Sequence, residues 1–315
     1  MAWTSANIPS LEGKVAVVTG ANGGLGLETS RAMAAAGATV VMVARDPAKT
    51  EKALRDIRDA VPDALLEVVP TDLGSLASIA RSASQIADSH KSIDILVNNA
   101  GIMGISESTT EDGFETQFGV NHLGHWALTA QLLPQILAAP AARVVTVTST
   151  AHHFGRSIDP DNPHLHGRYG PWRAYFQSKL ANFHFALGLQ HKLEAANAPA
   201  ASLVAHPGLS DTNLQTVSVE KSDGAASQKF FLWLAHQTGM GPASGALPQL
   251  RAATDPDALG GQFYAPRYAN SGPPVRRPVL RRLGLDGAVG RLWEVSERET
   301  GLALEPASVL AGKSA

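Results

Sequence analysis

The sequence contains no cysteine. Disulfides, thiolate catalysis and cysteine-held metals are therefore excluded, and the composition fits a reducing compartment. The sequence also lacks a large excess of positive or negative charge, because its formal net charge is only -2 over 315 residues. This near-neutral charge gives no electrostatic reason to expect a nucleic-acid partner. A local basic cluster near the C-terminus comprises Arg276, Arg277, Arg281 and Arg282. We interpret it as a solvated surface turn.

Long hydrophobic runs are missing as well. The N-terminal stretch "MAWTSANIPS" has neither the basic region nor the apolar run of a signal peptide. The apolar run 230–235 is far too short to cross a bilayer. We therefore expect a cytoplasmic protein without stable membrane insertion.

Hydrophobic residues make up 44% of the chain, and many occur in short β-branched runs without polar alternation. Such runs are typical of strands buried on both faces of a parallel sheet. Segments with helical spacing separate them, which predicts a doubly wound α/β sheet with helices on both faces. The five predicted strands are "KVAVVTG" (14–20), "ATVVMVA" (38–44), "IDILVNNAG" (93–101), "RVVTVTS" (143–149) and "SLVAHPG" (202–208).

No linker or repeat divides the chain, so residues 1–315 are predicted to form a single domain. Residues 12–265 would be its core, with the catalytic site included. The remaining residues, 266–315, are predicted to be a C-terminal extension. The Gly- and Pro-rich stretch 260–278, which spans this boundary, is expected to be irregular, and 288–302 to form a terminal amphipathic helix.

A glycine-rich turn follows the first predicted strand and precedes a helix. Its glycines are Gly20, Gly24 and Gly26, whereas the G-x-G-x-x-G spacing is not met because Thr29 takes the place of the third glycine. Glycines let the backbone approach a pyrophosphate, and the helix N-terminus favours its charge. The position favours dinucleotide binding over a purely structural loop.

This turn and several later motifs resemble the short-chain dehydrogenase/reductases, over about residues 12–265. The best likeness is to retinol-dehydrogenase-like members and their bacterial relatives. A Rossmann fold is implied, with a cofactor site formed by Gly20, Asn22, Gly24, Leu25, Gly26, Arg45, Asp72, Leu73, Asn99, Ala100, Gly101, Tyr175, Lys179, Pro207, Gly208 and Thr212. The catalytic residues implied by the resemblance are Ser149, Tyr175, Lys179 and Asn121.

The pair Tyr175 and Lys179 shares one helix face at i, i+4 spacing. A nearby positive charge favours the phenolate, so Lys179 and an oxidised nicotinamide could together lower the tyrosine pKa. In the reductive direction the same tyrosine would donate a proton to a carbonyl oxygen. By the resemblance, Ser149 would bind the substrate oxygen, Lys179 would also hold ribose hydroxyls, and Asn121 would carry a water.

Tyr175 follows Ser149 by 26 positions, which exceeds the usual family spacing. The polar, proline-containing insertion predicts a surface loop over residues 154–172. Tyr169 is not the active tyrosine, since Arg173 stands four residues on and Pro171 disfavours a helix across them. Four histidines lie in or near this loop: His152, His153, His164 and His166. Their spacing does not match a metal-ligand pattern, so no metal site is predicted.

Cofactor choice depends on the end of the second strand. The acid position that selects NAD falls on Ala44, and Arg45 follows it. An arginine fork suits a 2′-phosphate, so NADP(H) is predicted rather than NAD(H). The alternative, that Arg45 is a solvated loop residue, is favoured by Asp46 and by the lack of a basic residue within 21–24.

The substrate is expected to be a small-molecule carbonyl compound or alcohol, bulky and apolar. Residues 228–240 suggest an apolar lid or dimer-contact helix, with a core helix as the alternative. Homodimers are common in the family, so the resemblance leaves a homodimer open, with the tail either adding to that contact or blocking it. The candidate pocket walls are Met103, Phe154, Trp172, Leu209 and Trp233.

The leading function is an NADP(H)-dependent oxidoreductase, and the alternative from another class is a non-catalytic NADP(H)-binding sensor or scaffold. Such a sensor typically loses Tyr, Lys or Ser, and this sequence retains all three. A relative of protochlorophyllide reductase is disfavoured, because that activity relies on a cysteine and this sequence has none.

Overall fold

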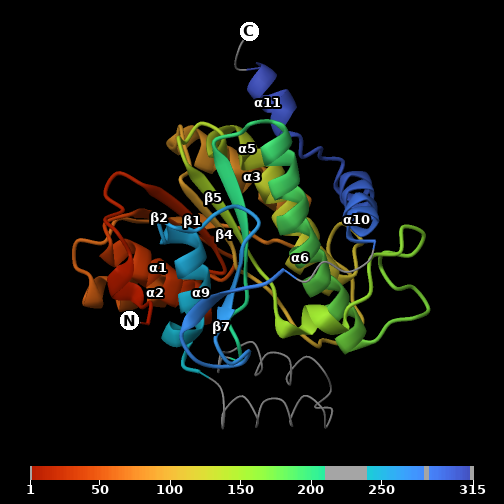
Figure 1. The fold of residues 1–315 in the computed structure, drawn as a ribbon, viewed down its shortest axis with the longest axis horizontal. Helices are drawn as coiled ribbons and strands as arrows, with labels where there is room; N and C mark the ends of the chain where they lie inside the picture. The colour runs from red at the N-terminus through yellow and green to blue at the C-terminus, as the bar shows by residue number, and fades with distance from the viewer. Residues whose placement is uncertain (1, 210–239, 280–283, 313–315) are drawn as a thin grey trace.

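The computed structural model describes residues 2–209, 240–279 and 284–312. Within these ranges the centre is an eight-stranded sheet in the order β3-β2-β1-β4-β5-β6-β7-β8 (Figure 1). Neighbouring strands are parallel except for β7 and β8, which are antiparallel. The strands are β1 (Val15–Thr19), β2 (Thr39–Ala44), β3 (Leu66–Pro70), β4 (Ile95–Asn98), β5 (Ala142–Val147), β6 (Ala200–Ala205), β7 (Phe263–Pro266) and β8 (Pro274–Arg277).

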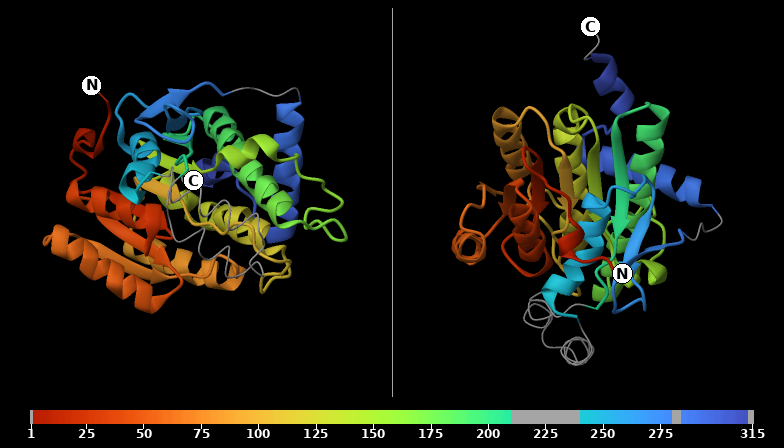
Figure 2. Two further views of the ribbon diagram at one scale, coloured as in Figure 1. Left: turned by 90° about the horizontal axis from the view of Figure 1, so that it is seen from below. Right: turned by 60° about the vertical axis from the view of Figure 1, so that its left-hand side comes forward.

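Helices cover both faces of the sheet, as Figures 1 and 2 show. The first layer contains α1 (Gly24–Ala35), α2 (Pro47–Ala60) and α9 (Pro242–Thr254), and the second contains α3 (Leu76–Ser89), α5 (Gly124–Ile136) and α6 (Pro171–Ala195). The doubly wound α/β fold predicted from the sequence is therefore confirmed. Short turns complete this part of the chain: Ser5–Asn7, α4 (Thr116–Phe118), a π-helical turn at Gly119–Leu123, and Thr150–Phe154.

The strand residues alternate between two hydrophobic cores. Val17 packs in the core on the α3, α5 and α6 side, whereas its neighbours Ala16 and Val18 pack on the α1, α2 and α9 side. Burial on both faces explains why the central strands read as continuous apolar runs. Strand β3 lies at the sheet edge and carries Glu67, which explains why no comparable run marks it in the sequence.

The expectation that residues 260–278 are irregular is wrong, because strands β7 and β8 lie within this stretch and pair with each other. Its prolines sit where a ladder tolerates them. Pro266 ends β7, and its register partner Pro274 begins β8, the edge strand of the sheet. A missing N–H at an edge or a strand end leaves few donors unpaired.

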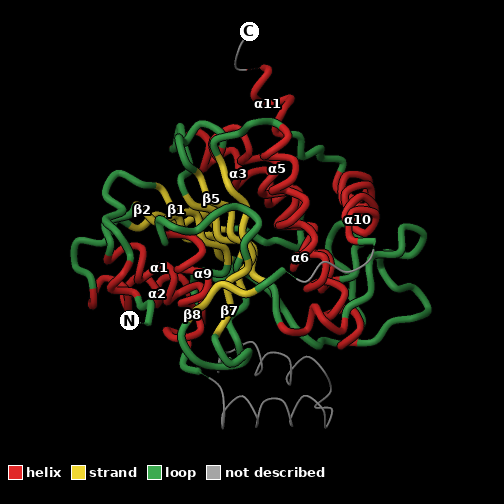
Figure 3. Tube along the Cα trace, in the orientation of Figure 1, coloured by secondary structure: helices red, strands yellow, loops and turns green. Residues whose placement is uncertain are grey.

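The C-terminal residues form α10 (Leu285–Thr300) and α11 (Pro306–Gly312), so a helix lies close to the predicted range 288–302, and a second, shorter helix follows it. Helix α10 lies on the outer side of α6 (Figure 3). Its Trp293 ring stacks on Phe185 at a centroid distance of 5.9 Å and meets Trp126 edge-on at 4.8 Å. Gly188 of α6 allows this approach, since a Cβ there would lie 2.3 Å from the Trp293 ring.

Candidate active site

A cleft of about 750 Å³ opens at the carboxyl ends of the strands, where ligands bind in open α/β sheets. Most of the residues predicted for the cofactor line it: Gly20, Asn22, Gly24, Leu25, Arg45, Asp72, Leu73, Asn99, Ala100, Gly101, Tyr175, Lys179, Pro207 and Gly208. Ser149 lines it as well, whereas Gly26 and Asn121 are not among its lining residues. Thr212 lies outside the described residues.

The glycine-rich turn is packed too closely for side chains at one position. A Cβ on Gly26 would lie 2.2 Å from the carbonyl oxygen of Gly20 and 2.7 Å from Nδ2 of Asn99. Asn99 in turn donates from Nδ2 to the carbonyl oxygen of Thr19 at 2.8 Å. Gly26 therefore lets the start of α1 pack tightly on the turn, while Gly20, Gly23 and Gly24 line the cleft without side chains, which suits the charge and shape of a pyrophosphate.

The opposite end of the cleft is equally bare at Gly101. A Cβ added there would lie 3.2 Å from Oδ1 of Asn121 and 3.3 Å from Nζ of Lys179. Glycine at this position therefore avoids a close contact with Asn121 and Lys179.

The end of β2 brings positive charge to the cleft. Nη1 of Arg45 lies 3.4 Å from Oδ2 of Asp72, and both side chains are well exposed. Lys49 also lines the cleft, in the first turn of α2. Lys49 was not among the cofactor residues predicted from the sequence. The Asp46-Pro47 pair is typical of a helix start and would have placed Lys49 in the first turn of that helix.

Tyr175 and Lys179 both project from α6 into the cleft. The Nζ atom of Lys179 lies 5.9 Å from the centroid of the tyrosine ring. Burial raises the pKa of Tyr175 to about 12, opposed by a hydrogen bond with the Ser149 side chain. Burial also lowers the pKa of Lys179 to about 8. Among the groups of the chain itself, desolvation therefore outweighs the attraction of Lys179 for a phenolate.

Asn121 lies behind the cleft, in the π-helical turn. Its Oδ1 accepts from the N–H of Ile102 at 2.8 Å, and its Nδ2 donates to the carbonyl of Ile102 at 2.9 Å. Nδ2 also donates to Oγ of Ser178 at 2.9 Å. The side chain therefore joins the loop after β4 to helix α6, and π-helical turns recur at functional sites.

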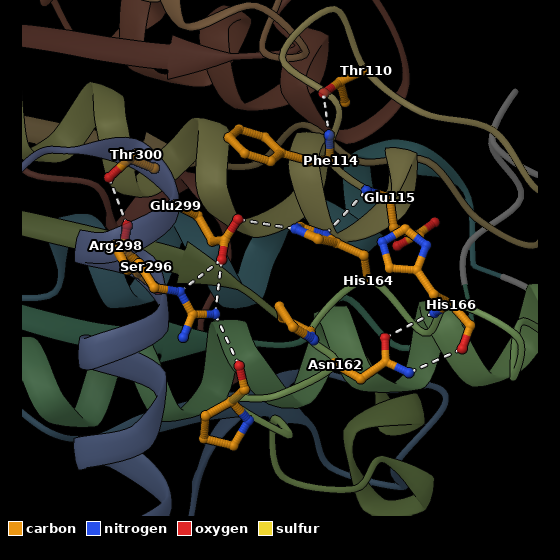
Figure 4. Close-up of polar contacts among 12 residues, drawn as sticks. Thr110, Phe114, Glu115, Asn162, His164, His166, Ser296, Arg298, Glu299 and Thr300 are labelled. Carbon is orange, nitrogen blue, oxygen red and sulfur yellow. Dashed lines mark hydrogen bonds and ion pairs between the residues drawn. The ribbon is translucent and has the colours of Figure 1, made fainter.

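The long loop between Ser149 and α6 is tied to the rest of the protein by polar contacts (Figure 4). Nδ1 of His164 accepts from the N–H of Glu115 at 3.2 Å, and its Nε2 lies 3.0 Å from Oε2 of Glu299 on α10. Tyr169 donates its hydroxyl to the carbonyl of Ile105 at 2.8 Å and lies before α6, which begins at Pro171. Tyr169 is thus separate from the Tyr175–Lys179 helix, as predicted.

The remaining histidines are held in the fold. Nδ1 of His152 contacts the carbonyl of Ser149 at 2.5 Å, and its ring stacks on Phe183. Burial lowers the pKa of His206 to about 3, and the ring bonds the carbonyl of Ala269 at 3.2 Å. Within residues 2–209, 240–279 and 284–312, no three His, Cys, Asp or Glu side chains are grouped so as to hold a metal ion.

The predicted substrate walls fall into three groups. Met103 and Leu209 line the cleft. Trp172 meets the Tyr175 ring at a centroid distance of 6.2 Å, and Phe154 is 72% exposed beside Phe176. Trp233 and the predicted lid, apart from Met240, lie outside the described residues.

Further lining residues were not anticipated from the sequence, among them Ile102, Ile105, Ser106, Glu107, Ser108, Thr116 and Val120. They lie in the segment after β4, which has no motif of its own.

None of the helices that the structure describes is long and apolar enough to span a membrane.

Comparison with known proteins matches residues 14–223 to the short chain dehydrogenase family. Polyprenol dehydrogenase of Mus musculus is 37% identical over 306 residues, 93% of this chain and 86% of that protein. Retinol dehydrogenase 13 of Mus musculus is 33% identical over 305 residues, 94% and 86% of the two chains. The crystal structure of an uncharacterized protein from Mycobacterium Paratuberculosis superposes with a TM-score of 0.78 at 40% identity, covering 96% of this chain and 99% of that one.

The chain belongs to the short-chain dehydrogenase family, in which its relatives include retinol dehydrogenases. It is an oxidoreductase acting on carbonyl and alcohol groups, and its family uses a nicotinamide dinucleotide. The family and enzyme class predicted from the motifs are confirmed.

Proposed function

We propose that the protein is an NADP(H)-dependent reductase of bulky apolar ketones or aldehydes, able to run in reverse on the alcohols. The observation that carries this proposal is the grouping of Ser149, Tyr175 and Lys179 at one end of the cleft. The Ser149 and Tyr175 side chains are hydrogen-bonded, and Lys179 lies one helical turn further along α6.

NADPH, when bound, would supply the hydride. The chain would do the rest through its own groups. The hydroxyls of Ser149 and Tyr175 would hold the substrate oxygen, where negative charge develops during reduction. With a pKa of about 12, Tyr175 carries its proton at neutral pH and is the donor to that oxygen. Lys179 would hold positive charge beside the reacting groups.

Selection of NADP(H) over NAD(H) would come from Arg45 and Lys49. Both line the cleft, and Ala44 stands where an acid would bind the ribose 2′-hydroxyl. Arg45 pairs with Asp72 at 3.4 Å and Lys49 with Asp46 at 3.8 Å, and a 2′-phosphate would replace these carboxylates as the partner of the two cations. A related dehydrogenase structure from Beutenbergia cavernae, with 26% identity and a TM-score of 0.61, contains NADP.

An apolar substrate is supported by the side chains near the reacting end. Ile102, Met103, Ile105 and Leu209 line the cleft there. Polyprenol and retinol, named in the relatives, are themselves apolar alcohols. Burial of such a substrate is favourable at about 25 cal/mol per Å² of apolar surface.

The test is to incubate the protein with NADPH and a panel of apolar ketones and aldehydes while following the reduced nicotinamide's absorbance. We expect turnover, and we expect Tyr175→Phe to abolish it while NADPH still binds. Tyr169→Phe is the matched control, because that hydroxyl is bonded to the carbonyl of Ile105. Cofactor binding without turnover across the panel would instead favour a non-catalytic sensor.

A further inference from the structure

We propose that His125 is a positioning residue for the reaction, whose ring fixes the π-helical turn of Asn121 to the end of β1. The inference rests on the proposed roles of Tyr175 and Lys179. His125 itself does not line the cleft, so it would act through its hydrogen-bond partners.

The His125 ring makes two short contacts on opposite sides. Its Nε2 lies 2.8 Å from Oγ1 of Thr19, the last residue of β1. Its Nδ1 lies 2.9 Å from the carbonyl oxygen of Asn121. His125 is 1% exposed, and Thr19 and Asn121 are fully buried, so no solvent competes for these bonds.

The proton positions follow from the partners. A carbonyl only accepts, so Nδ1 must carry a hydrogen to bond Asn121. Burial lowers the pKa of His125 to about 4, so at neutral pH the ring has one proton and Nε2 is an acceptor. Thr19 then donates its hydroxyl to Nε2 at 2.8 Å, the shorter of its two acceptor contacts, the other being the carbonyl oxygen of Val97 at 3.3 Å. Its lone pairs are already used, because Oγ1 accepts from the N–H groups of Asn99 and Ala100 at 2.9 and 3.0 Å.

The same network continues to the catalytic helix. Nδ2 of Asn121 donates to Oγ of Ser178, which donates to the carbonyl oxygen of Tyr175 at 2.8 Å. Oδ1 of Asn121 accepts from the N–H of Ile102 in the loop that lines the cleft. The His125 ring therefore stands between two parts of the site, the strand-end loops on one side and α6 on the other.

The electrostatics connect these two sides. The positive charge of Lys179 is one of the causes that lower the pKa of His125. A neutral ring in the Nδ1–H form makes both bonds without adding a second positive charge near the lysine. A change of donor pattern at this ring would shift the Asn121 turn, and a misplacement of about 1 Å can cost about 100-fold in rate.

Two substitutions separate the two bonds. In His125→Asn the amide takes the place of Nδ1 and can still donate to Asn121. In His125→Gln the amide takes the place of Nε2, which keeps the contact with Thr19 and loses the donor to Asn121. His191→Gln is the control, because His191 is exposed on α6.

We expect His125→Gln to lower kcat about 10- to 100-fold, with the Kd for NADPH unchanged, and His125→Asn to stay close to the unsubstituted enzyme. Equal kcat values in the two variants, whether both are high or both low, would overturn the proposal, because a merely structural histidine does not distinguish its nitrogens.

A second measurement needs neither a substrate nor a folded variant. The ¹⁵N spectrum of the unsubstituted protein should show His125 with a protonated Nδ1 and an unprotonated Nε2. The opposite tautomer, or a charged ring at neutral pH, would refute the proton placement and the proposal with it. Failure to turn over any carbonyl compound would instead count against the proposed function, whereas this spectrum tests the two His125 bonds independently of turnover.

Discussion

Nζ of Lys179 lies 5.9 Å from the Tyr175 ring centroid, and burial shifts both groups towards their uncharged forms. The lysine is the group of this pair that changes charge near neutral pH. Its positive charge is present below its pKa of about 8 and is lost as the pH rises through that value.

We therefore predict that kcat for carbonyl reduction falls as the pH rises through about 8. Lys179→Arg should move this fall to higher pH, because a guanidinium remains protonated. Lys179→Met should give low activity with no such fall. The measurement is kcat against pH at saturating NADPH and ketone. A wild-type profile that stays flat well above pH 8 would show that the lysine charge is not needed.

Arg45→Ala is predicted to raise the KM for NADPH far more than that for NADH. Lys49→Ala should do the same to a smaller extent, with losses of roughly 5- to 10-fold for exposed charge-assisted contacts. Binding of 2′,5′-ADP and 5′-AMP, measured by calorimetry, tests this apart from catalysis. Arg55→Ala is the control, since Arg55 pairs with Glu51 on the same helix and does not line the cleft. Equal losses for the two nucleotides would contradict the assignment.

Gly188→Ala is predicted to destabilise the protein although alanine favours a helix. The new Cβ would lie 2.3 Å from the Trp293 ring and 2.7 Å from Val289, and overpacking costs typically about 1–3 kcal/mol. Gly290→Ala on α10 meets nothing within 4 Å and should gain about 0.5–1 kcal/mol. Urea unfolding of both variants tests the contrast, and an equally stable pair would mean that α10 does not press on α6 at this point.

Glu115 makes stability depend on pH. Burial raises its pKa from 4.5 to about 7, against the N–H groups of Gln117 and Phe118 that favour the carboxylate. The folded state therefore holds the proton more tightly. The contribution of Glu115 to the free energy of unfolding is fully present below about pH 4.5 and is lost as the pH rises through about 7. This change amounts to about 3 kcal/mol at most.

Glu115→Gln should flatten this part of the curve of unfolding free energy against pH, whereas Glu111→Gln, at an exposed position, should not change its slope. Chemical unfolding at several pH values between 4.5 and 8 is the measurement. A slope in Glu115→Gln that matches the unsubstituted protein would assign the dependence to other groups.

The parts of the site that were predictable are those for which the chemistry leaves little choice of residue. Gly26 admits no side chain, and the i, i+4 spacing places Tyr175 and Lys179 on one face of a helix. Such constraints are local and appear as motifs. The buried central strands were predictable for the same reason, since burial on both faces demands continuous apolar runs.

Most of the remainder depends on partners distant in the chain. Lys49 is an exception, because Asp46-Pro47 marks the start of its helix, but no local pattern shows that this turn faces the cleft. Nothing in the sequence around His125 indicates that the fold places its ring between Thr19 and Asn121. Strand β8 was missed because Pro274 is unfavourable inside a sheet, and only its place at the start of an edge strand makes it harmless.

The packing of Trp293 also has a consequence for synthesis. Its neighbours Trp126 and Phe185 leave the ribosome well before α10 does, and Trp126 donates its indole N–H to the carbonyl of Leu302, which comes later still. This side of the core therefore acquires its cover only at a late stage of translation. A chain that ends before α10 lacks the Trp293 ring that packs against Trp126 and Phe185.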